Sequence, residues 1–380
     1  MKQILRMWWP IFAAMALIQA GNGLTGTLIS VTSEARDFAP WLKGLILSAF
    51  YAGSIAGALL GPAAIARSTH VASLSGFTLL AVAATAGYAL TDAPFVWVLL
   101  RFMAGVGISG VFATVESWLN LGTGDDRRAR VFSIYIMTQL GGLAAGQLFL
   151  NARGWGNEVL FLTAAVLTLL ALGAMRFEAM QNPPYHEPTK MGLIGLFRRS
   201  PFGVSAVVLS GYAWAALMAS GPALVELVGL SDFAKSMFMV LAIVCGMIAQ
   251  FPVGSVADGM DRRSVLAAMA FTAAVASLAG FWDGGLGLML FAAIFGAATF
   301  PLYAVGVARV SERLQQSERT AASASMIVFF LLGAIVAPPL LAYAMALFGP
   351  HAYFVALALP HLAFAITALV AARQRVAQSS

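Results

Sequence analysis

Charged residues are scarce in this sequence. Only 10% of its 380 residues are Asp, Glu, Lys or Arg, whereas a typical soluble domain has about 25%. Hydrophobic residues make up 60%, and the mean hydropathy is +0.86. Apolar runs of about 20 residues, long enough to cross a bilayer, recur along the whole chain. They are rich in Ala, Leu and Gly and lack strand-like alternation, so the sequence predicts a polytopic helical membrane protein rather than a barrel.

Several motifs of enzymes and cofactor sites are also missing. The one cysteine, Cys245, excludes an intramolecular disulfide and a cysteine-rich metal site. No G-x-x-x-x-G-K loop occurs, so we do not expect ATP to drive this protein. There is no His/Glu metal spacing and no nucleophile elbow. We therefore expect no enzymatic activity, no metal and no cofactor.

The apolar runs predict an all-α fold with twelve transmembrane helices. The first run follows two positive charges, as a secretory signal would, but it is too long for a signal core and no small-x-small cleavage site follows it. We interpret it as the first helix. The expected spans cover residues 8–32, 42–65, 71–91, 95–120, 131–151, 159–176, 201–225, 234–255, 263–282, 286–308, 321–347 and 352–372.

The distribution of basic residues predicts the orientation of the chain. With the N-terminus inside, most Lys and Arg fall in cytoplasmic segments, which places both termini in the cytoplasm by the positive-inside rule. The net charge of +6 is then a topology signal and implies no nucleic-acid partner. The outer segments hold only Arg36, Lys43, Arg153 and Lys235.

A polar stretch divides the spans six and six. Residues 177–200 contain a Pro-Pro pair, a His and several basic residues, which is typical of a linker. We expect it to lie in the cytoplasm, between an N-terminal half of residues 1–176 and a C-terminal half of residues 201–380.

The two halves show traces of an internal repeat. A shift of 191 positions brings Gly105 onto Gly296 and Gly142 onto Gly333. Chance matches between Gly-rich helices are the alternative, but the ordered set favours a repeat. Two repeated six-helix halves are typical of a transporter with a site between them at the membrane midplane.

One charged loop interrupts the apolar runs between the eighth and ninth spans. GSVADGMDRRS resembles the loop signature of the major facilitator superfamily, with matches at Gly254, Asp258, Arg262 and Arg263. Gly259 and Asp261 depart from the signature, and the first-half copy, GPAAIARSTH, has lost the aspartate. The resemblance covers the whole chain and implies the facilitator fold.

The same resemblance implies a gate at this loop. Asp258 would face the start of the fifth span, near Arg130, in the outward-open state. A carboxylate at a helix N-terminus gains roughly 0.3–2 kcal/mol, which would be lost when the halves separate. The alternative is that these charges only cap helix ends and set topology.

The fourth span carries the two charges that lie deepest in apolar sequence. RFMAGVGISG resembles the family's pattern of an arginine followed by spaced glycines, and the sequence after it resembles a bacterial facilitator group whose members are mostly uncharacterised. Charges within a membrane are costly and suggest function. We expect Arg101 to face the central cavity and to attract an anionic group or stabilise the ionised form of a nearby acid. The alternative is a role in helix packing. Glu116 either couples transport to protons or pairs with Arg127, Arg128 or Arg130.

Few other polar or aromatic side chains could bind a substrate. Such a set suits an amphipathic solute better than a sugar, although each residue could instead serve helix packing. His361, in the twelfth span, could shuttle protons or pack against its neighbours. The remaining candidates are Gln19, Asn22, Tyr135, Gln139, Tyr212, Trp214, Gln250 and Tyr303.

These features predict a secondary transporter in a bacterial inner membrane. We expect a monomer that uses protons as its energy source, with uniport as the alternative. Gly142 and Gly146 match the glycine-rich fifth span of family antiporters, but Gln147 replaces the proline, so export is favoured only mildly. The alternative is a facilitator-like protein that has lost transport and acts as a membrane sensor or assembly partner.

Overall fold

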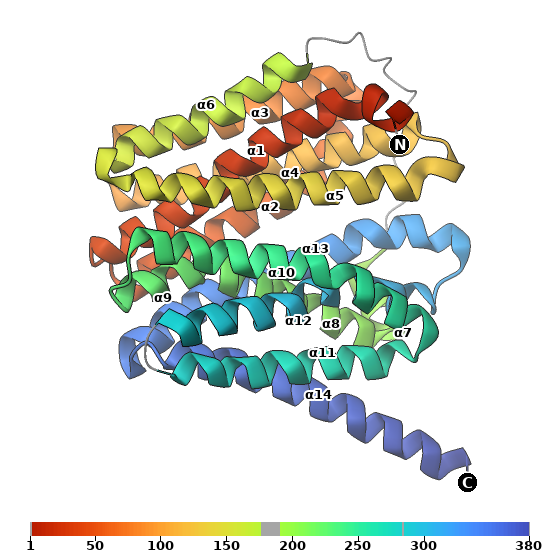
Figure 1. Ribbon diagram of the computed structural model, residues 1–380. Coiled ribbons are helices and arrows are strands. Elements are labelled where there is room, and N and C mark those ends of the chain that lie inside the picture. Colours follow the sequence, from red (N-terminus) through yellow and green to blue (C-terminus); the bar gives the residue numbers. More distant parts are fainter. Residues whose placement is uncertain (1, 176–190, 283–284, 380) are drawn as a thin grey trace. The chain divides into compact units, whose positions relative to one another are not determined.

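The computed structural model describes residues 2–175, 191–282 and 285–379 (Figure 1). The chain divides into two compact units, one of residues 1–38 and 45–187 and the other of residues 39–44 and 188–380. The described part of each unit consists of helices and their connections. The linker expected over residues 177–200 lies largely outside the described residues.

The described part of the first unit contains six long helices, with short 3₁₀ turns after the third and the fifth. The turns, η1 (Tyr88–Leu90) and η2 (Phe149–Trp155), extend α3 and α5. The long helices are α1 (Lys2–Ala35), α2 (Pro40–Arg67), α3 (His70–Gly87), α4 (Pro94–Gly122), α5 (Asp125–Leu148) and α6 (Asn157–Met175).

The second unit begins with a short helix, α7 (Leu193–Arg199), at the described end of the expected linker. Its first span is built from α8 (Pro201–Ala215), a π-helical turn η3 (Ala216–Ser220) and α9 (Gly221–Leu227). The others are α10 (Asp232–Gly259), α11 (Arg262–Ala276) with the 3₁₀ turn η4 (Ser277–Phe281), α12 (Gly285–Ser311), α13 (Gln316–Phe348) and α14 (Ala352–Ser379).

The prediction of twelve transmembrane helices is confirmed. Within the described residues, eleven helices are long and apolar enough to cross a membrane, and a shorter apolar helix spans Ala352–Ala368. Large apolar side chains remain exposed on several of them, such as Leu90 at 83% and Phe348 at 79%. Such exposure is expected where the surrounding solvent is lipid.

Helix packing in the first unit gathers its core around α1. This helix lies against α5 and α6, while α3 packs against α4 (Figure 1). Trp8, Met15, Val115 and Tyr135 are fully or nearly fully buried in the cluster that results. In the second unit α8 packs against α12 and α13, and α10 packs against α12.

Glycines at equivalent places in the two units allow helix backbones to approach closely. A Cβ at Gly105 would lie 2.0 Å from the carbonyl oxygen of Phe50 in α2, and one at Gly296 would lie 2.3 Å from that of Ala242 in α10. Both distances are too short for any other residue without a shift of the neighbouring helix. The pair Gly105 and Gly296, aligned by the repeat, therefore performs the same packing role in both units.

Candidate functional site

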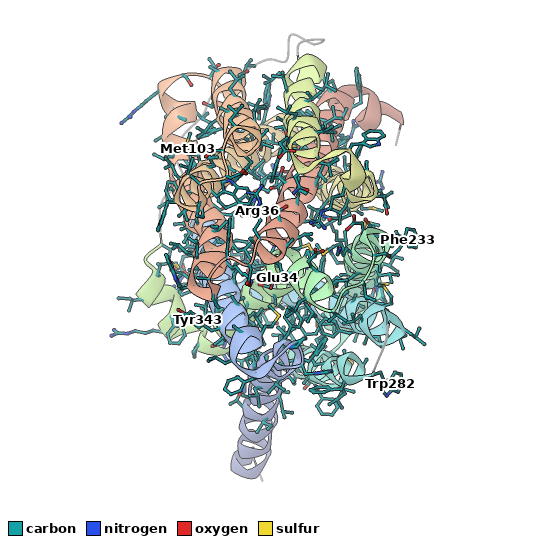
Figure 2. All side chains as sticks on the ribbon, turned by 90° about the vertical axis from the view of Figure 1, so that its left-hand side faces the viewer. Glu34, Arg36, Met103, Phe233, Trp282 and Tyr343 are labelled. Atoms are coloured by element: carbon teal, nitrogen blue, oxygen red, sulfur yellow. The ribbon has the colours of Figure 1, made fainter. Side chains whose placement is uncertain are left out.

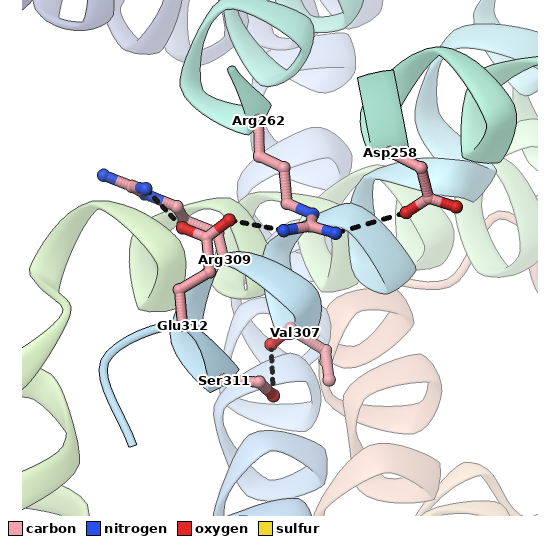
Figure 3. Close-up of polar contacts among 6 residues, drawn as sticks. All are labelled: Asp258, Arg262, Val307, Arg309, Ser311 and Glu312. Atoms are coloured by element: carbon pink, nitrogen blue, oxygen red, sulfur yellow. Dashed lines mark hydrogen bonds and ion pairs between the residues drawn. The ribbon is translucent and has the colours of Figure 1, made fainter. Parts of the chain in front are cut away.

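A network of four charged side chains lies where α10, α11 and α12 meet in the second unit (Figure 3). The guanidinium of Arg262 donates to Asp258 at 3.2 Å and to Glu312 at 2.5 Å. Arg309 donates to the other oxygen of Glu312. Arg262 thus connects the end of α10 and the end of α12 from the first turn of α11.

The local sequence explains how this network is positioned. Asp261 is the N-cap of α11, and its carboxylate accepts from the backbone N–H of Ser264 at 3.2 Å. This cap starts the helix directly at Arg262. Arg263 lies with its guanidinium 5.0 Å from the ring centroid of Phe202 in α8. A Cβ at Gly254 would meet no described atom within 4 Å.

Glu312 lies just beyond the membrane-spanning part of α12. Partial burial would raise the pKa of its carboxyl, but hydrogen bonds from Arg262 and Arg309 outweigh this effect and hold the pKa below its ordinary value. Glu312 is therefore ionised at neutral pH. The side chain of Asp258 is 80% exposed, and one of its carboxylate oxygens forms an ion pair with Arg262.

Arg101 is buried in the first unit, with only 4% of its surface exposed. Its guanidinium carbon lies 4.3 Å from the ring centroid of Phe50 in α2, and it interacts electrostatically with Tyr51 and Tyr88. Its Nε and Nη1 atoms have no hydrogen-bond partner. No carboxylate among the described residues forms an ion pair with it.

A second arginine of the first unit, Arg36, is paired. Arg36, labelled in Figure 2 just after the end of α1, forms an ion pair with Asp92 at 2.7 Å. Its guanidinium also lies over the ring of Trp97, 5.2 Å from the centroid. Trp97 in turn makes an edge contact with Tyr88.

Glu116 lies further along α4 and is half-buried. The pairing expected with Arg127, Arg128 or Arg130 does not occur, and Glu116 has no ion-pair partner in the described part of the chain. Glu116 interacts electrostatically with Tyr135 of α5, which is 1% exposed. Gln139 follows one turn later and is half-buried.

Polar contacts join α1 to α5 in the first unit. The hydroxyl of Thr27 donates to the amide oxygen of Gln147 at 2.5 Å, and both side chains are buried. Gln147 stands where family antiporters have proline, so here an interhelical hydrogen bond occupies that position. On α1 itself, Asn22 donates to Gln19 at 3.2 Å.

The candidates in the second unit contact neighbouring helices. The hydroxyl of Tyr212 donates to the carbonyl of Ala356 in α14 at 2.9 Å. Trp214 packs 5.0 Å from Phe300, and Tyr303 packs 5.4 Å from Phe330, between ring centroids. Gln250, on α10, is half-buried.

His361 is completely buried in α14. Its Nδ1 atom lies 2.7 Å from the carbonyl oxygen of Leu357, so it donates within its own helix. Its ring contacts Phe295 edge to face, 5.2 Å between centroids. From the sequence, His361 could either shuttle protons or pack against its neighbours. The contacts that it makes in the structure are of the packing kind.

A large apolar cavity lies within the second unit. Its volume is about 1240 Å³, and it is bordered by α8, α13 and α14. Tyr212, Ser205 and His351 are the polar side chains among its lining residues. In the described part of the chain, no group of three or more His, Cys, Asp or Glu side chains could hold a metal ion.

Two features of these sites were missed from the sequence. Glu312 is the centre of the charge network, and the pattern Arg309 to Glu312, three residues apart at a helix end, could have indicated it. Lys235 is 5% exposed and pairs with Glu226 and, at 2.8 Å, with Asp232. The sequence showed it only as an outer basic residue.

Comparisons with known proteins agree with this architecture. The sequence matches the Major Facilitator Superfamily over residues 11–249 and 203–380. It is 24% identical over 350 residues to an uncharacterised MFS-type transporter of Enterobacter sp. (strain 638), covering 92% of this chain and 91% of that protein. The same values hold for the uncharacterised MFS-type transporter YcaD of Escherichia coli.

Solved structures share the fold at low sequence identity. The crystal structure of the nucleoside transporter NupG superimposes with a TM-score of 0.80 and 13% identity, covering 96% of this chain and 99% of that chain. A bacterial homologue of the human lysosomal transporter Spinster gives a TM-score of 0.65 and 18% identity, covering 96% and 95%. With the family match spanning nearly the whole sequence, the chain belongs to the Major Facilitator Superfamily.

Proposed function

We propose that this facilitator moves a small amphipathic organic solute across the bacterial inner membrane by alternating access. Membership of the superfamily makes it a secondary transporter. The amphipathic character is supported by the few polar side chains among its candidate residues, several of which are aromatic and packed against other rings. A sugar would need more hydrogen-bond partners than these helices supply.

The observation that carries the proposal is the charge network of Asp258, Arg262, Arg309 and Glu312. Its ion pairs are partly exposed, and such pairs contribute about 0–1 kcal/mol each. Interactions this weak can break and re-form at little cost, which suits a device that biases two conformations of similar free energy. We assign the network to the cytoplasmic gate, with Asp258 as its switching carboxylate.

Asp258→Asn tests this assignment. The substitution removes one charge but leaves the Arg262–Glu312 pair, so we expect the population to shift toward the inward-open state. The readout is the labelling rate of Gln139→Cys by a membrane-impermeant maleimide in inside-out vesicles. Cys245→Ser removes the native thiol in every variant. We expect Asp258→Asn to raise the rate several-fold.

Asp261→Asn is the matched control. It makes the same charge change three residues away, outside the network, and asparagine is as good an N-cap as aspartate. We expect its labelling rate to equal that of the background. An unchanged labelling rate in Asp258→Asn would refute the gate. If the cysteine at position 139 is labelled from only one face of the membrane under all conditions, a sensor or assembly partner would be favoured.

We further propose coupling to protons through Glu116, operation as a monomer, cytoplasmic termini and a mild preference for export. Glu116 is half-buried and lacks an ion-pair partner among the described residues, whereas the ring of His361 is held by packing and by the Leu357 carbonyl. A carboxyl without a fixed counter-charge can exchange a proton without breaking a structural ion pair.

A further inference from the structure

The guanidinium of Arg101 is a buried cation without an ion-pair partner in the described part of the first unit. It lies about 10 Å along α4 from the helix start at Pro94, at 1.5 Å per residue, within a membrane-spanning helix. Only 4% of the side chain is exposed. A buried cation without a counter-charge is strongly unfavourable in such surroundings.

Among the described residues, the surroundings of Arg101 offer donors and aromatic rings but no acceptor carboxylate. The rings of Phe50, Tyr51 and Tyr88 come from α2 and η1. The Tyr88 hydroxyl is buried and, like Nε and Nη1 of Arg101, has no hydrogen-bond partner. Contact with the Phe50 ring partly offsets the burial of the charge, but it satisfies none of the guanidinium N–H groups.

The neighbouring helix places no side chain directly beside this guanidinium. Gly26 of α1 faces it, and a Cβ at that position would lie 3.4 Å from Nη2 of Arg101. One turn further along the same face of α1 is Ser30, whose buried hydroxyl also has no partner. Donors from α4, η1 and α1 are therefore all unsatisfied in this part of the unit.

A comparison with Arg36 shows what Arg101 lacks. Both guanidinium groups lie over aromatic rings, Phe50 for Arg101 and Trp97 for Arg36. Arg36 has Asp92 as its carboxylate, 2.7 Å away. Among the described residues, Arg36 thus has a counter-charge and the more deeply buried Arg101 has none.

We propose that Arg101 binds the anionic group of the transported solute, which is an organic anion with an aromatic or other apolar body. A carboxylate would accept two parallel hydrogen bonds from the guanidinium. The rings of Phe50, Tyr51 and Tyr88 would contact the apolar body. This inference rests on the proposed transport function and names its substrate class.

The test uses three probes that differ only in their polar group, on the full-length protein in detergent. They are 2-naphthoate, 2-naphthamide and 2-naphthylmethylammonium, and the readout is the shift in melting temperature across a concentration series. We expect naphthoate alone to stabilise the wild-type protein. Equal shifts with naphthamide, or no shift with naphthoate and a wider series of organic anions, would overturn the inference.

Variants at Arg101 complete the test. Arg101→Gln should weaken naphthoate binding roughly 10- to 100-fold, the loss expected for a hydrogen bond to a charged group, while Arg101→Lys should keep part of the affinity. Because the wild-type charge is unpaired, Arg101→Gln without probe should melt no lower than wild type. A lower melting temperature together with unchanged naphthoate binding would show that Arg101 only supports packing.

This result is independent of the gate experiment. Altered labelling in Asp258→Asn together with no anion binding would leave the transport function in place and remove the substrate class. Anion binding that depends on Arg101, with labelling unaffected by Asp258→Asn, would keep the binding site and remove the gate.

Discussion

Gly142 of α5 lies so close to Ala16 of α1 that a Cβ on the glycine would sit 2.4 Å from the carbonyl oxygen of Ala16. A Cβ on the preceding residue, Gly141, would lie in open space, with no described atom within 4 Å. Adjacent glycines thus have different roles on the two sides of one helix. The first sets the distance between α1 and α5, and the second does not.

Gly142→Ala should therefore destabilise the protein. The added methyl group forces α5 away from α1, and overpacking of this kind costs about 1–3 kcal/mol. Gly141→Ala is the control, because it adds the same group on the open side and improves helix propensity. Thermal unfolding in detergent should show a lower melting temperature for the first variant only. Equal melting temperatures would mean that α1 and α5 are not closely packed in the membrane.

A second prediction concerns the pH dependence of stability through Glu312. Its pKa in the folded protein is lower than the ordinary value of 4.5, so the folded state binds this proton less readily than the unfolded state. The stabilisation is complete above about pH 4.5 and is lost as the pH falls through the lowered pKa. Glu312→Gln should thus lower the melting temperature at pH 7 but not at the acid end of the range.

The size of this effect is limited by exposure, since ion pairs of this kind contribute about 0–1 kcal/mol. Glu158→Gln is the control, because Glu158 is exposed and has no ion pair among the described residues. It should lower the melting temperature at pH 7 less than Glu312→Gln does. A Glu312→Gln curve parallel to that of wild type over the whole pH range would contradict the network seen in Figure 3.

The fold could be predicted from the sequence because its physical signals are repeated many times. Each span is an apolar run of bilayer length, and the structure contains helices at the expected places. The repeat was also visible, since Gly142 and Gly333 are aligned in sequence. A Cβ at Gly333 would lie 2.0 Å from the carbonyl oxygen of Val208. Small residues carry this signal because only they permit such an approach.

The partners of individual side chains could not be predicted in the same way. The bond from Tyr212 to the Ala356 carbonyl connects residues 144 positions apart, and no periodic pattern reports such a contact. Burial of Lys235 depends on its ion pairs with Glu226 and Asp232, whereas the sequence showed Lys235 only as an outer basic residue. Sequence identified Arg101 as unusual, but only the structure shows that no described carboxylate pairs with its guanidinium.

The last prediction separates Glu116 from His361 as the proton carrier. Glu116→Gln keeps the shape of the side chain but cannot exchange a proton, so a coupled transporter should become an exchanger. In proteoliposomes, a gradient of one pH unit is worth about 1.4 kcal/mol, enough for up to about tenfold accumulation of a solute moved with one proton. The solute is an organic anion that stabilises the protein. We expect Glu116→Gln to accumulate none of it but to retain counterflow exchange. His361→Asn should still accumulate it, because the His361 ring is occupied in packing with Phe295. Accumulation by Glu116→Gln, or its loss in His361→Asn with exchange intact, would move the proton site away from α4.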